Sequence, residues 1–232
     1  MKPHHQLPLY LPLQPNYAST DFIQSSCNAE ALRWIQRWPE WPLKFSAIYG
    51  ETRCGKTHLA HIWQEKSEAY FLTLQDIQHI SPAEIIKNYQ TFGIDNADSL
   101  FSAKDIQEQD YREKWLFHFY NLAQEKGAYC LIFGLQPPTQ WNLRLPDLRS
   151  RLSTVLSIAV YAPDEEALRT ILFKLSSERG LSISSESADY ILRRIERSFE
   201  KVCSVIEAID QHSLSTHRQP TTGLIREVLD HL

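Results

Sequence analysis

The segment GETRCGKT, residues 50–57, limits the folds open to this chain more than any other part of the sequence. It matches the pattern GxxxxGK[ST], in which a glycine-rich loop wraps a phosphate with its backbone N–H groups. The pattern assigns Gly50 and Gly55 to the wrapping backbone, Lys56 to the outer phosphates and Thr57 to a Mg²⁺ ion. An apolar stretch precedes the loop and a stretch with helical spacing follows it, as a phosphate loop requires. The segment therefore predicts a nucleotide-binding α/β domain.

Expected strands and helices alternate along the chain up to about residue 162. The expected strands are apolar runs at residues 44–49, 69–74, 91–95, 128–134 and 155–162. Stretches with helical spacing or helix-start signals are found at 27–39, 57–66, 81–90, 112–127 and 146–152. Such alternation predicts a parallel sheet with helices on its faces.

Beyond Pro163 the pattern changes to helices alone. Three amphipathic stretches, at residues 164–180, 187–211 and 221–232, have no strand between them. We therefore expect an α/β nucleotide-binding domain over residues 20–162 and a small all-helical lid domain over residues 163–232, which is a size suited to packing on a larger partner domain.

In the second of these stretches, taken as one continuous helix, apolar residues recur on one side. They are Phe199, Val202, Ile206 and Ile209. Arg197 falls roughly opposite this stripe, so that it is free to face solvent or a nucleotide.

The first 19 residues contain an apolar hexapeptide, QLPLYL, at residues 6–11. Prolines around it exclude a regular helix and favour an extended strip. The segment lacks the features of a secretory signal, and no apolar run in the chain approaches the ~20 residues needed to span a bilayer. We therefore expect a cytoplasmic protein without a membrane partner, in which this strip is either a docking motif or an arm on the protein's own surface.

Charge and cysteine content exclude several classes of function. The net charge is −4, with 24 basic and 28 acidic residues, so no overall positive field attracts duplex DNA directly. The cysteines lie far apart without CxxC spacing, which indicates neither a zinc site nor a disulfide framework. They are Cys27, Cys54, Cys130 and Cys203.

An acid that holds Mg²⁺ is expected at the end of a strand near the phosphate loop. Asp95, in FGIDNAD, is the best candidate, with a simple turn aspartate as the alternative. Asn96 follows at the position where many hydrolytic ATPases of this architecture carry a glutamate. Because an amide cannot take a proton from water, we expect good nucleotide binding and weak intrinsic ATPase activity.

Five segments together resemble the Hda family, DnaA-related AAA+ proteins that switch off replication initiation. They are QLPLYL, GETRCGKTHLAHIW, GIDNAD, LQPPTQWNLRLPDLRSRL and YILRRIERSFEKVCSVIEAID. The similarity spans essentially the whole chain. It implies a bound nucleotide, ADP or ATP, with Mg²⁺ held through it by Thr57 and Asp95. ADP is the more plausible resident because of Asn96.

The resemblance also assigns partners. The hexapeptide would dock in the cleft of the sliding clamp, the beta subunit of DNA polymerase III, through Gln6, Leu7, Leu9 and Leu11. DNA would then be reached only through the clamp. Arg151 would be an arginine finger that enters the ATP site of DnaA and promotes hydrolysis there, and Arg197 would sense nucleotide within its own subunit.

The sequence leaves several points open. Without the resemblance, Arg151 and Arg197 are ordinary exposed arginines. Leu135 stands at a sensor position where relatives often carry a polar residue. A self-sufficient ATPase such as a helicase loader, and a non-catalytic clamp adaptor, are the alternative functions. The oligomeric state is open, a homodimer included.

Overall fold

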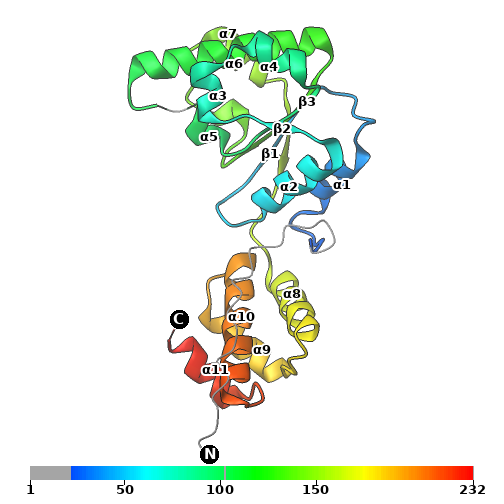
Figure 1. The fold of residues 1–232 in the computed structure, drawn as a ribbon, viewed down its shortest axis with the longest axis vertical. Coiled ribbons are helices and arrows are strands. Elements are labelled where there is room, and N and C mark those ends of the chain that lie inside the picture. Colours follow the sequence, from blue (N-terminus) through cyan, green and yellow to red (C-terminus); the bar gives the residue numbers. More distant parts are fainter. Residues whose placement is uncertain (1–21, 102, 232) are drawn as a thin grey trace, which may run out of the picture. The chain divides into compact units, whose positions relative to one another are not determined.

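The structure is a computed structural model in which residues 22–101 and 103–231 are described. Within them, residues 22–161 form one compact unit and residues 162–231 a second (Figure 1). Each unit is described by itself below. No helix in these residues combines the length and the apolar composition of a segment that crosses a membrane.

A five-stranded sheet forms the centre of the first unit. Its strands are β1 (Phe45–Tyr49), β2 (Tyr70–Phe71), β3 (Thr91–Ile94), β4 (Tyr129–Gly134) and β5 (Leu156–Ala159). They lie in the order β2-β3-β4-β1-β5, and every neighbouring pair is parallel. Parallel neighbours need a crossover connection, which the intervening helices supply. The prediction of an α/β fold with a parallel sheet is confirmed.

Helices cover both faces of this sheet. They are α1 (Ala29–Arg37), α2 (Lys56–Ser67), α3 (Leu74–His79), α4 (Pro82–Asn88), α5 (Ala97–Leu100), α6 (Ile106–Lys126) and α7 (Pro146–Leu152), with a single 3₁₀ turn, η2 (Pro138–Gln140). Buried side chains of α3, α4, α6 and α7 form one core with the sheet, and those of α1 and α2 form another. The unit is thus a three-layer sandwich.

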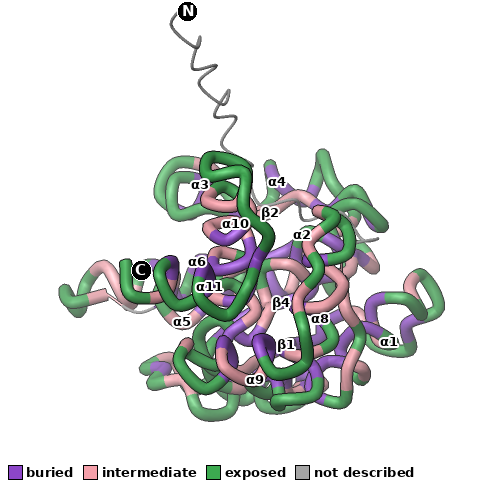
Figure 2. Tube along the Cα trace, turned by 90° about the horizontal axis from the view of Figure 1, so that it is seen from below, coloured by how far each residue is buried: buried purple, intermediate pink, exposed green. Residues whose placement is uncertain are grey.

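The central strand β4 supplies side chains to both cores. Cys130 and Ile132 pack on the side of α6, whereas Leu131 and Phe133 pack on the side of α1 and α2. Because successive side chains of a strand point to opposite faces, a strand covered on both sides must be apolar throughout. Every position of β4 from Cys130 to Gly134 is accordingly buried, and only Tyr129 at its start is half-buried (Figure 2).

The predicted strand at 69–74 is mostly wrong, since only Tyr70–Phe71 pair with a neighbour. A capping box begins α3 directly afterwards. The Thr73 hydroxyl accepts a hydrogen bond from the Asp76 N–H at 3.2 Å, and the Asp76 carboxylate accepts one from the Thr73 N–H at 2.8 Å. This reciprocal cap satisfies two helix-end donors and ends the extended backbone.

The helix predicted over 112–127 begins earlier, at Ile106. The Asp105 carboxylate caps it by accepting a hydrogen bond from the Glu108 N–H at 3.3 Å. Its end is as predicted: Gly127 adopts a left-handed conformation with φ of 67°, and its N–H bonds back to the last turn.

The second unit is all helical, as predicted, but has four helices in its described residues. They are α8 (Glu165–Glu178), α9 (Ser185–Arg194), α10 (Phe199–Thr216) and α11 (Thr222–Leu229). The predicted helix over 187–211 is wrong because it is broken between α9 and α10. The Ser198 hydroxyl accepts a hydrogen bond from the Lys201 N–H at 3.1 Å and starts a new helix there. The predicted apolar face of α10 is confirmed, with Val202, Ile206 and Ile209 fully buried and Phe199, at the start of the helix, half-buried.

Candidate functional site

The carboxyl ends of β1, β3 and β4 meet at one edge of the sheet. Tyr49 pairs with Gly134, and the Gly50 N–H donates to the Gly134 carbonyl at 3.2 Å. On the other side of β4, Ile94 pairs with Ile132. The phosphate loop, Asp95 and Leu135 therefore lie at the same edge, which is where open α/β sheets bind ligands.

The backbone of the phosphate loop requires its glycines. A Cβ on Gly50 would lie 2.1 Å from the Val160 carbonyl oxygen, so no larger residue fits there. Gly55 has φ of 100°, a conformation that favours glycine, and Arg53 is also left-handed with φ of 63°. Such turns point successive N–H groups towards one space and form anion-binding concavities.

The N-terminus of α2 is free of competing acceptors. Its N-cap is Gly55, which has no side chain to accept a hydrogen bond, and its first turn contains no acidic residue. Among the α-helices of the described residues, α2 alone combines these two features. The N–H groups and the helix dipole are thus available to a phosphate. The residues present fit a nucleotide.

Lys56 spans the loop at this helix end. Its ammonium donates to the carbonyl oxygens of Gly50 at 2.8 Å and Glu51 at 2.7 Å. Cys54 lies buried beneath the loop, with its sulfur 3.8 Å from the Lys56 ammonium. Burial raises the pKa of the Cys54 thiol, and the positive charge of Lys56 opposes part of that rise. The thiol is therefore neutral at pH 7 and places no negative charge beside Lys56.

The predicted acid and its neighbour follow β3 directly. Asp95 is half-buried, and its carboxylate accepts a hydrogen bond from the Asn96 N–H at 2.8 Å. Asn96 is exposed and left-handed, with φ of 55°. Thr57, the other predicted Mg²⁺ ligand, is exposed in the first turn of α2. No cluster of three or more His, Cys, Asp or Glu in the described part of the chain could hold a metal ion, so Mg²⁺ here would need the phosphates as ligands.

A carboxylate that the sequence did not single out holds the backbone after β4, where the sensor position is predicted. Asp98, on α5, accepts hydrogen bonds from the backbone N–H groups of Leu135 and, at 3.3 Å, Gln136. The Leu135 side chain itself is 43% exposed and offers no polar atom. Asp98 thus ties the end of β4 to the helix that follows Asp95. Sequence reasoning did not find this contact because Asp98 and Leu135 are 37 residues apart in the chain.

Arg151 lies in the last turn of α7 and is exposed. Leu148 and Leu152, on the same helix, are fully buried in the core beside α6 and anchor it. Among the described residues the Arg151 guanidinium has no hydrogen-bond or ion-pair partner. An unpaired guanidinium on an anchored helix is available to a phosphate of another molecule.

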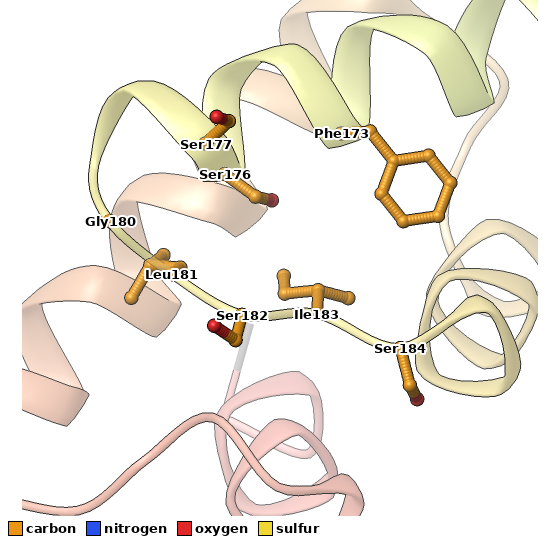
Figure 3. A pocket seen from close by; sticks show the side chains of 8 residues that line it. All are labelled: Phe173, Ser176, Ser177, Gly180, Leu181, Ser182, Ile183 and Ser184. Atoms are coloured by element: carbon orange, nitrogen blue, oxygen red, sulfur yellow. The ribbon is translucent and has the colours of Figure 1, made fainter.

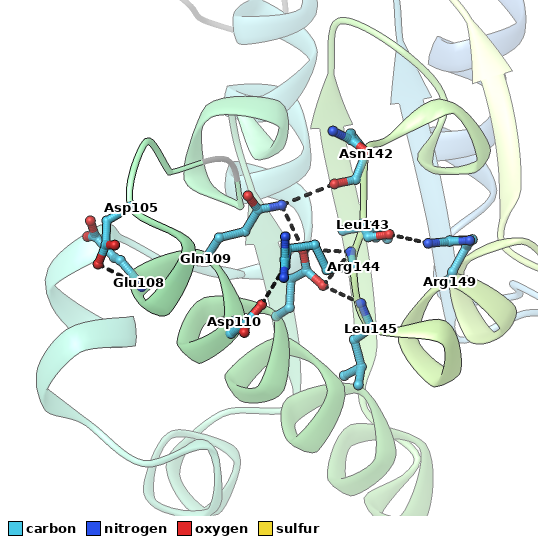
Figure 4. A network of polar contacts seen from close by, with 10 residues as sticks. Asp105, Glu108, Gln109, Asp110, Asn142, Leu143, Arg144, Leu145 and Arg149 are labelled. Carbon is cyan, nitrogen blue, oxygen red and sulfur yellow. Dashed lines mark hydrogen bonds and ion pairs between the residues drawn. The ribbon is translucent and has the colours of Figure 1, made fainter.

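The segment that leads into α7 is fixed by polar contacts to α6 (Figure 4). The Arg144 guanidinium pairs with Asp110 at 2.9 Å, and the Gln109 amide donates to the Asn142 carbonyl at 3.1 Å. Beneath them the fully buried Glu113 accepts hydrogen bonds from backbone N–H groups of the same segment. Sequence reasoning missed Glu113, because nothing local distinguishes it from the other acids of α6.

Arg197 belongs to the lid unit, where it is exposed in the connection between α9 and α10. Its placement on a helix opposite the apolar stripe was therefore wrong. A hollow in the same unit is lined by the end of α8 and by residues 180–184, with Phe173, Ser176 and Ser184 on its wall (Figure 3). None of the predicted site residues lines this hollow.

The predicted clamp-binding residues lie outside the described residues. They are Gln6, Leu7, Leu9 and Leu11. Their assignment stays a prediction.

Comparisons with known proteins find similarity in both units. Residues 164–229 match the family model of the Hda lid domain. A protein of Haemophilus influenzae without an assigned function is 23% identical over 195 residues, which cover 80% of this chain and 81% of that protein.

Solved structures of DnaA share the fold. Domain III of the Thermotoga maritima replication initiation protein DnaA aligns with a TM-score of 0.74 and 18% identity, over 95% of this chain and 98% of that one. DnaA bound to AMPPCP and single-stranded DNA aligns with a TM-score of 0.71 and 18% identity, over 93% of this chain and 69% of that one. The fold is thus that of domain III of DnaA.

Proposed function

Because this chain is a DnaA-like AAA+ protein that carries an Hda lid domain, we propose that it is a negative regulator of chromosomal replication initiation that acts on DnaA. The reaction that it promotes is hydrolysis of the ATP bound to DnaA. Arg151 carries this proposal: it is exposed and unpaired among the described residues, and it lies on a helix anchored in the core.

The protein's own nucleotide is proposed to have a structural role. Lys56 would exchange its bonds to the loop carbonyls for bonds to phosphate oxygens, and Thr57 and Asp95 would hold Mg²⁺ bound to the same phosphates. Asn96 provides an amide where a base would be needed, so water is not activated efficiently. A structural role does not require turnover of ATP, and we expect ADP as the resident ligand.

Arg151 is proposed to act in trans. When DnaA binds against α7, the guanidinium would reach the γ-phosphate of the DnaA-bound ATP. There its charge and its planar donor groups would stabilise the negative charge that builds up as the phosphoryl group is transferred. DnaA would be left in its ADP form, which is inactive in initiation.

The N-terminal hexapeptide is proposed to tether the protein to the DNA-loaded sliding clamp, the beta subunit of DNA polymerase III. Leu9 and Leu11 would fill the apolar cleft and Gln6 would anchor by its amide. The prolines keep the strip extended and so lower the ordering cost of binding. The regulator would then contact DNA only through the clamp, and only where replication has begun.

The test is hydrolysis of radiolabelled ATP prebound to DnaA, in the presence of clamp loaded on DNA. Intact protein is compared with Arg151→Ala and with the double variant Leu9→Ala/Leu11→Ala. We expect the intact protein to accelerate hydrolysis, Arg151→Ala to lose the acceleration at every concentration, and the leucine variant to recover it only at high concentration.

Each alternative function gives a different result. A self-sufficient ATPase would hydrolyse free ATP rapidly by itself and lose that activity in Lys56→Ala. A clamp adaptor without a catalytic group would retain its effect on DnaA in Arg151→Ala. No acceleration by the intact protein would refute the proposal.

A further inference from the structure

We propose that Glu113 is a positioning residue for Arg151: from α6 it sets the place at which α7 begins. The inference rests on the proposed role of Arg151 in trans. It adds that Glu113 holds the helix that carries Arg151 in a fixed position. Glu113 does not contact Arg151 or a nucleotide, and it acts through the backbone of the segment that precedes α7.

The Glu113 carboxylate accepts hydrogen bonds from the backbone N–H groups of two consecutive residues, Arg144 and Leu145. One oxygen of Glu113 accepts from the Leu145 N–H at 2.7 Å, and the Arg144 N–H lies 2.9 and 3.0 Å from the two oxygens. The Gln109 side chain donates a further bond to Glu113 at 2.9 Å. The carboxylate has no exposed surface, so these bonds replace the water that it loses.

Glu113 supplies a cap that α7 cannot make for itself. Leu145 is the N-cap residue of α7, and its side chain has no atom that accepts a hydrogen bond. In a capping box, an acid of the helix's own first turn accepts the N–H of the N-cap residue. Here the acid comes from a different helix, 32 residues away in the chain. The start of α7 is therefore fixed to α6 rather than to its own local sequence.

The remaining anchors of α7 hold it less specifically. Leu148 and Leu152 are buried in the core, and the Arg149 guanidinium donates to the Leu143 carbonyl within the same segment. Apolar contacts are not directional, so they keep the helix on the core without fixing its register along it. Loss of the carboxylate should let the first turn of α7 move while the helix stays folded. A shift of about 1 Å in a catalytic group can cost on the order of a hundredfold in rate.

Glu113→Gln is the primary variant, because it keeps the shape, removes the negative charge and puts an NH₂ group in place of one of the two oxygens that accept hydrogen bonds. Gln109→Ala is a milder variant that removes one donor from the carboxylate together with the hydrogen bond to the Asn142 carbonyl. Asp110→Asn is the matched control, since it weakens an exposed ion pair to the side chain of the same Arg144 and leaves the backbone bonds intact. All three are made in the full-length chain.

Amide hydrogen exchange tests the positioning without reference to DnaA. In Glu113→Gln we expect exchange of residues 144–152 to accelerate about tenfold or more, while the strands β1 and β4 keep their protection as an internal measure of folding. Gln109→Ala should give a smaller acceleration, and Asp110→Asn almost none. Unchanged exchange of residues 144–152 in Glu113→Gln would overturn the inference.

Hydrolysis of DnaA-bound ATP then tests whether a shift of α7 lowers the rate that the protein stimulates. We expect Glu113→Gln to lower the maximal stimulated rate by about tenfold to a hundredfold. The protein concentration that gives half-maximal stimulation should stay the same, because the surface that binds DnaA is kept. A purely structural role would instead lower stability and leave the rate per folded molecule unchanged. If the intact protein gives no stimulation, the proposed function fails, and hydrogen exchange still decides the role of Glu113.

Discussion

The segment before α7 and the connection between α9 and α10 both lead into a helix beside an arginine of predicted function, yet they are held differently. Glu113 fixes the first from another helix, with no exposure to solvent. Ser198 caps the second from within the connection itself, and the preceding residue, Arg197, is exposed. A bond between helices fixes a side chain relative to the whole domain, whereas a local cap fixes only where one helix begins. We infer a rigid finger at Arg151 and an adjustable contact at Arg197.

The variant with the largest expected effect is Arg151→Lys, which tests whether Arg151 acts through its geometry or only through its charge. Arg151→Lys keeps the positive charge on α7 but loses the planar group that donates two parallel hydrogen bonds to a phosphate. If the finger is rigid, the flexible lysine cannot substitute for it, and stimulated hydrolysis of DnaA-bound ATP should fall by about a hundredfold. Single-turnover hydrolysis at saturating protein measures this loss.

Arg37→Ala is the control for this experiment, because Arg37 is also exposed in the last turn of a helix, α1. It should stimulate hydrolysis like the intact protein. Near-normal activity of Arg151→Lys would mean that a positive charge without fixed geometry is sufficient, and the contrast between the two regions would lose its functional meaning.

Ser198→Ala tests the local cap of α10. The variant leaves the Lys201 N–H without its partner and should lower the free energy of unfolding of the lid by about 1 kcal/mol. Denaturant unfolding followed by circular dichroism measures this change. The control is Ser204→Ala within α10, where alanine favours the helix and no loss is expected. Equal stability of the two variants would show that the break between α9 and α10 does not depend on the cap.

Arg197→Ala has a smaller expected effect, on the affinity for the protein's own nucleotide. An exposed side chain on a connection loses conformational entropy when it binds, so a contact to phosphate is worth about 1 kcal/mol or less, or at most about fivefold in affinity. Titration with a fluorescent ADP analogue measures this, with Arg193→Ala in α9 as the control. A loss of a hundredfold or more would mean that Arg197 is as rigidly placed as Arg151.

Features that depend on residues close together in the chain could be predicted from the sequence. The phosphate loop, the buried strands and the Gly127 helix end each depend on a pattern within about ten residues, and the family resemblance added Arg151. The α/β fold and the helical lid followed from the order of these elements.

What could not be predicted depends on contacts between distant residues or on two competing patterns. Glu113 and Asp98 bind backbone groups more than 30 residues away, and neither has a local signature. The break before α10 was missed because residues 187–211 keep a helical apolar spacing through it, while a single serine cap decides the boundary. Arg197 was misplaced for the same reason.

The smallest expected effect concerns Glu227, an exposed counterpart of Glu113 in the lid. Its carboxylate is 3.1 Å from the Arg218 guanidinium and 3.6 Å from the His212 ring nitrogen. Arg218, through its hydrogen bond and its charge, lowers the pKa of Glu227, and His212 adds to the effect. A lowered pKa in the folded state stabilises the protein above the usual pKa of a glutamate, and this contribution is lost as the pH falls through the lowered value.

Glu227→Gln should therefore be slightly less stable than the intact protein at pH 7, with the difference disappearing in acid and at high salt. Thermal unfolding measured from pH 7 down to pH 3 follows it, with Glu207→Gln as a control that contacts Gln211 rather than an arginine. Both partners of Glu227 remain hydrated in the variant, in contrast to the partners of Glu113, whose carboxylate has no exposed surface. A loss of stability from Glu227→Gln as large as that from Glu113→Gln would show that burial is not what distinguishes the two carboxylates.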